Sequence, residues 1–175
     1  MPLLRPVALM LLLGTAAPVA MAASDGSLSS SSSQGSASIT ATIVPLVQIS
    51  GLDDLDLGEV GGTDVSASDG LCIYSNAGRY RITASGNGGD GGFQLTGRDQ
   101  GGALPYQVTW QRRDGAATAL QAGAAMTVQT GGVVGADCAG GGANAGIRVD
   151  LSAQAAAGLP ADSYAGVLNL VVAPD

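Results

Sequence analysis

From residue 39 onward, the chain consists of short runs in which apolar and polar residues alternate, separated by turns rich in Gly, Asn and Asp. One such run sets three apolar residues against three polar ones: Tyr80, Ile82 and Ala84 against Arg79, Arg81 and Thr83. Successive side chains of a β-strand point to opposite faces, so this period of two predicts strands with one buried face. We count about eight such runs, among them a short one at Leu55 and Leu57 and another from Tyr106 to Trp110, as is typical of an all-β sandwich or barrel.

Three segments qualify this pattern. The first run places the following side chains on one face of a predicted strand: Ile39, Ala41, Ile43, Pro45, Val47 and Ile49. Proline cannot donate to a sheet ladder, so Pro45 predicts a bulge, a break or an edge. The run from Tyr164 to Val172 is apolar enough to predict burial on both faces. Residues 153–157 alone look helical, and they are too few to form a stable helix by themselves.

The N-terminus has the three parts of a secretory signal peptide over residues 1–22. Arg5 supplies the charge, Pro6 to Val19 the apolar run, and Ala20-Met21-Ala22 the small residues before cleavage after Ala22 or Ala23. Residues 23–38 form a Ser- and Gly-rich leader that we expect to be flexible. We interpret the remainder, 39–175, as one domain with no membrane-spanning segment.

The sequence contains two cysteines, Cys72 and Cys138. In an exported chain we expect them to form one disulfide. Two unpaired buried thiols are the alternative. A zinc site is a less favoured alternative, because the chain has no histidine to complete the four ligands.

The absence of histidine also removes the commonest general base and the usual partner of a nucleophilic Ser or Cys. The carboxylates lie mainly in turns, where Asp has a structural role: Asp69-Gly70, Asp90-Gly91 and Asp114-Gly115. We therefore predict no catalytic residues. The glycine-rich stretches lack the lysine of a phosphate-binding loop.

Two segments are weak candidates for calcium binding. The turn Gly86–Gly92 resembles one copy of a repeated calcium-binding turn, but only one copy is present, so a hairpin loop is the better interpretation. Asp53, Asp54 and Asp56 are close in sequence, but the spacing and closing Glu of a helix-loop-helix site are missing. We predict no metal site and no cofactor.

The charge balance excludes some partners. The chain has 14 acidic and 7 basic residues, and loss of Arg5 leaves 14 against 6, a net charge of −8. Nucleic acids and anionic membrane surfaces attract clusters of Lys and Arg, whereas this chain has no Lys and scattered Arg. We therefore expect no nucleic-acid partner.

Five segments together resemble the spore coat protein U family, which includes the subunits of archaic chaperone–usher pili. They cover most of the chain after the leader: Ser38-Ile-Thr-Ala-Thr-Ile-Val-Pro45, Leu55-Asp-Leu-Gly58, Leu71-Cys-Ile-Tyr-Ser-Asn-Ala-Gly-Arg-Tyr-Arg-Ile-Thr-Ala-Ser85, Tyr106-Gln-Val-Thr-Trp110, and Leu159-Pro-Ala-Asp-Ser-Tyr-Ala-Gly-Val-Leu-Asn-Leu-Val-Val172. Members commonly carry an early cysteine, but the stretch 44–50 has none, so Cys138 takes the partner role here.

The resemblance implies an immunoglobulin-like β-sandwich that lacks its last strand. A periplasmic chaperone would first fill the open groove, and the N-terminal extension of another subunit would replace it by strand addition at an outer-membrane usher. The donor strand would be Ile39, Ala41 and Ile43, and the acceptor edge would be Tyr164, Val167, Leu168, Leu170 and Val172. The protein would pass through the periplasm to the cell surface as a fibre or coat subunit that supports adhesion and biofilm formation.

Alternatives remain open at this stage. Residues 39–49 are equally interpretable as the first strand of their own domain. The chain would then be a self-complete secreted binding module, for instance for carbohydrate, with Trp110 or Tyr74 stacking on the ligand. A hydrolase would require a cleft with two carboxylates about 5–10 Å apart.

Overall fold

The computed structural model describes residues 23–129, 138 and 142–175, so the predicted signal peptide lies outside the described residues. The chain divides into two units, one ending at Ile43 and the other running from Val44 to Asp175. In the first unit, Ser24 and Ser36 form an antiparallel bridge with two backbone hydrogen bonds of 2.9 Å. Every residue from 23 to 43 is exposed.

The second unit contains a five-stranded antiparallel sheet with the order β1-β2-β9-β6-β7. Its strands are β1 (Val47–Ser50), β2 (Val65–Ser75), β9 (Ala145–Leu151), β6 (Gln107–Arg112) and β7 (Ala117–Ala119). The Asp114-Gly115 turn noted in the sequence joins β6 to β7 as a hairpin, in which Gly115 has a positive φ of 83° and Asp114 accepts the Ala116 N–H at 3.0 Å.

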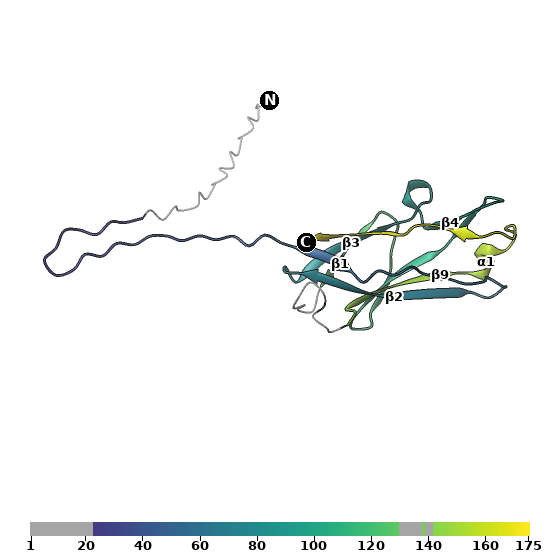
Figure 1. The fold of residues 1–175 in the computed structure, drawn as a ribbon, viewed down its shortest axis with the longest axis horizontal. Helices are drawn as coiled ribbons and strands as arrows, with labels where there is room; N and C mark the ends of the chain where they lie inside the picture. Colours follow the sequence, from purple (N-terminus) through teal and green to yellow (C-terminus); the bar gives the residue numbers. More distant parts are fainter. Residues whose placement is uncertain (1–22, 130–137, 139–141) are drawn as a thin grey trace, which may run out of the picture. The chain divides into compact units, whose positions relative to one another are not determined.

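Two three-stranded sheets form the other layer (Figure 1). One has the order β11-β3-β8, with β11 (Asn169–Pro174), β3 (Arg79–Ser85) and β8 (Ala125–Gln129). The other has the order β10-β4-β5, with β10 (Tyr164–Ala165), β4 (Gln94–Gly97) and β5 (Ala103–Pro105). A short 3₁₀ turn, η1 (Gly89–Gly91), lies between β3 and β4. The predicted all-β sandwich is confirmed.

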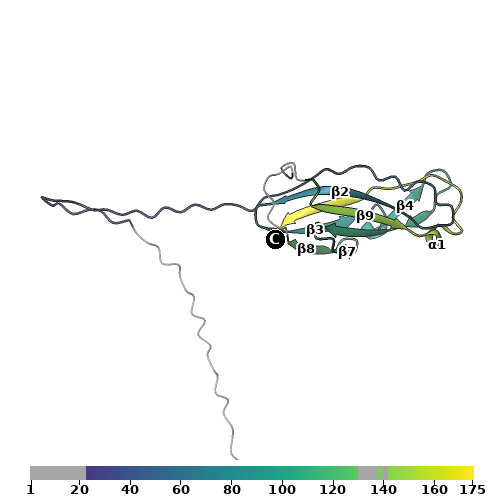
Figure 2. The ribbon, with the colours of Figure 1, turned by 90° about the horizontal axis from the view of Figure 1, so that it is seen from below.

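The only described α-helix, α1 (Ala153–Ala156), matches the short helical segment expected from sequence. Ser152 caps it by accepting the Ala155 N–H, and Asp64 accepts the Ala153 N–H at 2.9 Å. In both views α1 lies at one end of the sandwich and the C-terminus at the opposite end (Figures 1 and 2).

The core lies between the layers and follows the alternating pattern. Tyr80, Ile82 and Ala84 of β3 are buried, whereas Arg79 and Arg81 are exposed. The largest fully buried side chains come from both layers: Trp110, Leu71, Ile73, Ile82, Ile147, Leu151 and Val108. Because Trp110 is fully buried, it is not available to stack on a carbohydrate, and of the two residues considered for this role only the half-buried Tyr74 remains.

The disulfide predicted between Cys72 and Cys138 is confirmed, with the two Cα atoms 5.8 Å apart. It closes a sequence separation of 66 residues and attaches Cys138 to β2.

Two predicted strands differ from the structure. Of the run 39–49 only Val47–Ser50 forms a strand, consistent with the missing N–H of Pro45, and Ile39 and Ile43 are 94% and 88% exposed. The run 164–172 divides into β10 and β11, which pair with different strands. Its predicted burial on both faces is wrong, because Val167 and Val171 are each 60% exposed.

Candidate binding groove

An open groove of about 950 Å³ runs along one side of the second unit. One wall is the segment 52–60, and the other is formed by residues 159–168 and Leu170. The floor consists of apolar side chains from β4, β5, β9 and the residue between β5 and β6: Leu95, Leu104, Tyr106, Ile147, Val149 and Leu151. The groove therefore reaches down to the hydrophobic core along the gap between two chain segments, while its floor residues from Leu104 to Leu151 are themselves no more than 7% exposed.

The first wall follows directly from β1. Gly51, with a positive φ of 78°, ends β1, and beyond Ser50 the backbone no longer pairs with β2. Asp53 still donates its N–H to Asp69 Oδ2 at 2.8 Å, and Gly58 donates to Asp56 Oδ1 at 2.9 Å. Within the described residues, no backbone–backbone hydrogen bond involves residues 54–60. The sequence predicted a short strand at Leu55 and Leu57, but its backbone has no strand partner.

The second wall is formed by the C-terminal segment. β10 pairs with β4 and β11 pairs with β3, and each is the edge strand of its sheet, so one side of both strands has no partner in the described structure. Tyr164 is held by donating its hydroxyl proton to the Pro160 carbonyl at 2.9 Å. Gly166 lies where a Cβ atom would come within 2.7 Å of Asn87 Oδ1 and 3.0 Å of Leu95, which favours glycine at the bend between the strands.

The residues predicted as an acceptor edge separate into two groups. Tyr164, Val167, Leu168 and Leu170 line the groove. Val172 is part-buried against the core and does not line it. The predicted donor residues Ile39, Ala41 and Ile43 belong to the first unit and are exposed.

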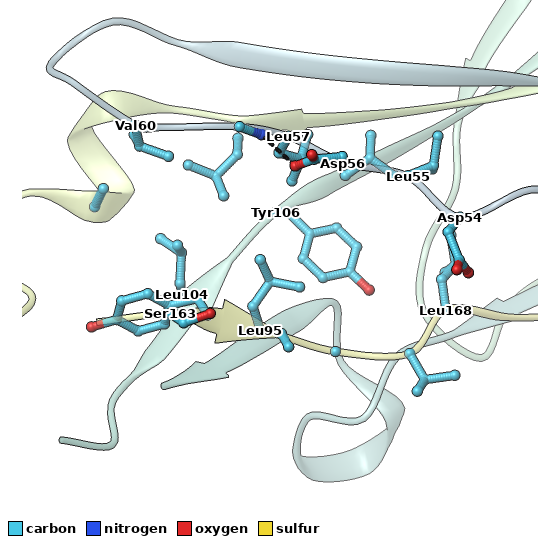
Figure 3. A pocket seen from close by; sticks show the side chains of 18 of the residues that line it. Asp54, Leu55, Asp56, Leu57, Val60, Leu95, Leu104, Tyr106, Ser163 and Leu168 are labelled. Atoms are coloured by element: carbon cyan, nitrogen blue, oxygen red, sulfur yellow. Dashed lines mark hydrogen bonds between the residues drawn. The ribbon is translucent and has the colours of Figure 1, made fainter. Parts of the chain in front are cut away.

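Tyr106 occupies the middle of the groove, between Leu57 on one wall and Leu95 from β4 (Figure 3). Its ring stacks on Phe93 with the centroids 5.8 Å apart, and burial raises the pKa of its hydroxyl. Sequence reasoning assigned Tyr106 to a strand and did not identify it, or the wall 52–60, as part of a site. The Leu55-Asp-Leu-Gly58 motif was the one sequence feature that pointed to this wall. Its two leucines predict an apolar face, but no adjacent run of residues indicates which segment packs against that face.

The rim of the groove is acidic. Five carboxylates line it and no Arg does: Asp53, Asp54, Asp56, Glu59 and Asp162. The pKa of Asp162 is lowered, chiefly by the hydrogen bond from the Gln100 N–H and also by those from Asp99 and Ser163. Among the described residues, no three acidic or cysteine side chains converge as metal ligands would.

No helix in the part of the chain that the structure describes is both long and apolar enough to cross a membrane.

Comparison with known proteins supports the fold. No family model matches the chain, and no curated protein matches it. A solved chain from a chaperone–tip adhesin complex, described as vital for synergistic activation of CFA/I fimbriae biogenesis, is similar with a TM-score of 0.54 and 20% sequence identity. The match covers 74% of this chain and 41% of that one, so this chain spans less than half of its length. At this identity the similarity shows a shared β-sandwich fold.

Proposed function

We propose that the protein is a structural subunit of a surface fibre or coat, and that its groove accepts an extended strand from another subunit. The observation that carries the proposal is the open gap between segment 52–60 and the edge strands β10 and β11, floored by core side chains. A strand laid into this gap would cover apolar side chains of the walls such as Val167, which is 60% exposed, and pair with backbone groups of the edge strands, which is how β-strand addition gives affinity.

The N-terminal unit supplies a matching segment. Ile39, Ala41 and Ile43 alternate with Thr40 and Thr42, so an extended segment presents its three apolar side chains to one face. Both isoleucines are exposed in this chain, and residues 35–43 carry no charge that the acidic rim would repel. The acceptor would include Tyr164, Val167, Leu168 and Leu170, with Val172 at its margin.

The resemblance to spore coat protein U and archaic pilus subunits adds the expected context. The chain would be exported, held in the periplasm by a chaperone that fills the same groove, and assembled at an outer-membrane usher with other copies or related subunits. Its role would be adhesion and biofilm formation rather than catalysis. The confirmed disulfide is typical of proteins that fold outside the reducing cytoplasm.

The test compares the mature chain, beginning near residue 23, with two variants. Ile39→Asp/Ile43→Asp should abolish polymerisation, because two charges would enter an apolar and acidic groove. Ser31→Asp/Ser33→Asp adds the same charge to the leader and should polymerise as the wild type does. Light scattering after size-exclusion chromatography gives the mass of each. Equal polymerisation of all three chains would rule the proposal out.

A complementation experiment identifies the acceptor. Leu168→Asp places a charge in the groove and leaves the N-terminal segment unchanged, and fluorescence of the buried Trp110 reports whether the variant folds. The Leu168→Asp chain and the Ile39→Asp/Ile43→Asp chain should each be monomeric, and their mixture should give a dimer of one copy each. If the mixture stays monomeric although both chains fold, the groove is not the acceptor of this segment.

A further inference from the structure

The chain enters the second unit through three hydrogen bonds made by one residue, Asn76. Its Oδ1 accepts the Leu46 N–H at 2.7 Å, and its Nδ2 donates to the Val44 carbonyl at 3.0 Å. Its own N–H donates to the Leu46 carbonyl at 3.2 Å. Pro45 lies between the two bonded residues, and a proline disfavours helical backbone at the preceding Val44. The path of the chain at 44–46 is therefore fixed to the turn that follows β2.

This anchor is far from most of the groove wall 52–60. Residues 46 and 53 both lie opposite β2, in the register that pairs Val47 with Ser75 and Ser50 with Cys72. Leu46 bonds to Asn76, and Asp53, near the start of the groove wall, bonds to Asp69. Asn76 and Asp69 are seven positions apart, which along an extended strand is about 23 Å.

The reach of the N-terminal segment is shorter than this distance. Ile43 is directly bonded to Val44, and Ile39 precedes Val44 by five positions. A fully extended chain covers at most about 3.6 Å per residue, so Ile39 reaches no more than about 18 Å from Val44. It would also have to reverse its direction at the anchored residues. Neither isoleucine therefore reaches Asp53 of its own chain, and Leu55 and Leu57 lie farther along.

We propose that Asn76 is a positioning residue that keeps Ile39 and Ile43 away from the groove of their own chain, so that only a second copy of this chain fills it. This inference rests on the proposed function. The anchor matters because a tethered segment has an effective concentration in the millimolar range, far above that of free subunits. If the segment reached its own groove, the closed monomer would outcompete the assembly.

A pair of insertions tests the reach. A flexible Gly/Ser insertion of about twelve residues between Ile43 and Val44 adds up to about 43 Å, enough to turn back and fill the groove. We expect this chain to become monomeric, with the amides of 39–43 protected from hydrogen exchange. The control has the same insertion between Ser36 and Ala37, which leaves the distance from Ile39 to Val44 unchanged. It should polymerise as the wild type does.

A second comparison tests Asn76 itself. With an insertion of about four residues after Ile43, Ile39 reaches about 32 Å from Val44 but Ile43 no more than about 18 Å, so the anchor still keeps the two isoleucines from entering the groove together and the chain should polymerise. Asn76→Ala in that chain releases residues 44–46, so that Val47 becomes the first residue held by β2. Ile43 then reaches about 29 Å from Val47, and Asp53 lies only about 20 Å from Val47. The monomer fraction should then rise several-fold. Asn76→Ala without the insertion controls for a loss of folding.

The outcomes separate the two proposals. If the twelve-residue insertion after Ile43 leaves polymerisation unchanged, the anchor does not control filling, although the groove can still be the acceptor. If the wild type is a monomer whose 39–43 amides are protected, the segment fills its own groove and the inference is wrong. If Ile39→Asp/Ile43→Asp polymerises normally, the proposed function fails first.

Discussion

The side-chain amide of Asn144 pairs with the backbone of Ile73 as a neighbouring strand would. Its Oδ1 accepts the Ile73 N–H at 2.8 Å, and its Nδ2 donates to the Ile73 carbonyl at 2.7 Å. The Asn144 N–H donates to the Leu71 carbonyl at 3.0 Å, directly before β9 begins to pair with β2 at Ala145. Asn144 thus extends the hydrogen-bond ladder between β2 and β9 by one residue before the start of β9.

Asn144→Ala should lower the free energy of unfolding by roughly 1–3 kcal/mol, because it leaves a backbone donor and acceptor beside the fully buried Ile73 without partners. Urea unfolding followed by Trp110 fluorescence measures the change. Asn169→Ala, which removes an exposed amide on β11, should change stability by less than about 0.5 kcal/mol. Equal effects of the two substitutions would show that the Asn144 pairing contributes nothing.

The alternating pattern correctly predicted those strands that pair within one layer and turn one face toward the core. β3 shows this most clearly, because Tyr80, Ile82 and Ala84 are buried, whereas Arg79 and Arg81 on the opposite face are exposed. The disulfide between Cys72 and Cys138 was also predictable, since an exported chain with two cysteines has one intramolecular pairing.

The groove was only partly predictable, because alternation shows that a segment is able to pair but not which chain it pairs with. Residues 39–46 read as a strand and yet have exposed side chains. Leu55 and Leu57 also read as a strand, but the backbone at 54–60 has no described ladder partner. Pairing with distant strands depends on register and chain direction, which local periodicity does not contain. The acceptor role of the C-terminal edge stays a prediction.

Removing the disulfide by Cys72→Ser/Cys138→Ser should destabilise the second unit. The bond closes 66 positions of chain, for which the loop-entropy relation gives about 4 kcal/mol. Urea unfolding of the wild type with dithiothreitol should shift toward that of the double variant, whereas dithiothreitol should not affect the variant. If dithiothreitol leaves the urea unfolding of the wild type unchanged, the disulfide does not contribute to the stability of the second unit.

Asp162 should make the loop between β4 and β5 sensitive to acid. Its Oδ2 accepts the N–H groups of Gln100 at 2.8 Å and Asp99 at 2.9 Å, and the Gln100 bond is the main cause of its lowered pKa. A carboxyl whose folded pKa lies below its unfolded value, about 3.9, stabilises the fold above that value and loses this effect as pH falls through the folded pKa.

Asp162→Asn should therefore unfold at lower urea than the wild type at pH 7, and the difference should shrink as pH falls from about 5 to 2. Paired urea titrations across this range measure it, and hydrogen exchange of the Asp99 and Gln100 amides localises the effect. A difference that stays constant with pH would show that the charge of Asp162 has no part in it.

Tyr80 should set an alkaline limit to stability. The side chain is 3% exposed, its ring lies edge-on to Trp110 with the centroids 6.4 Å apart, and burial raises the pKa of its hydroxyl from 10.0 to about 12. A tyrosine whose folded pKa exceeds its unfolded value contributes stability that is fully present below pH 10 and is lost as pH rises through about 12, at roughly 1.4 kcal/mol per unit.

Tyr80→Phe keeps the packing against Trp110 and removes the ionisable group, so its unfolding free energy should fall less between pH 10 and 12 than that of the wild type. Urea unfolding monitored by circular dichroism at intervals across this range gives the two slopes. A measurement at pH 7, where the hydroxyl is neutral in both folded and unfolded chains, separates any packing difference from the titration. Parallel slopes would show that Tyr80 ionises without cost in the folded protein, and that its burial does not limit alkaline stability.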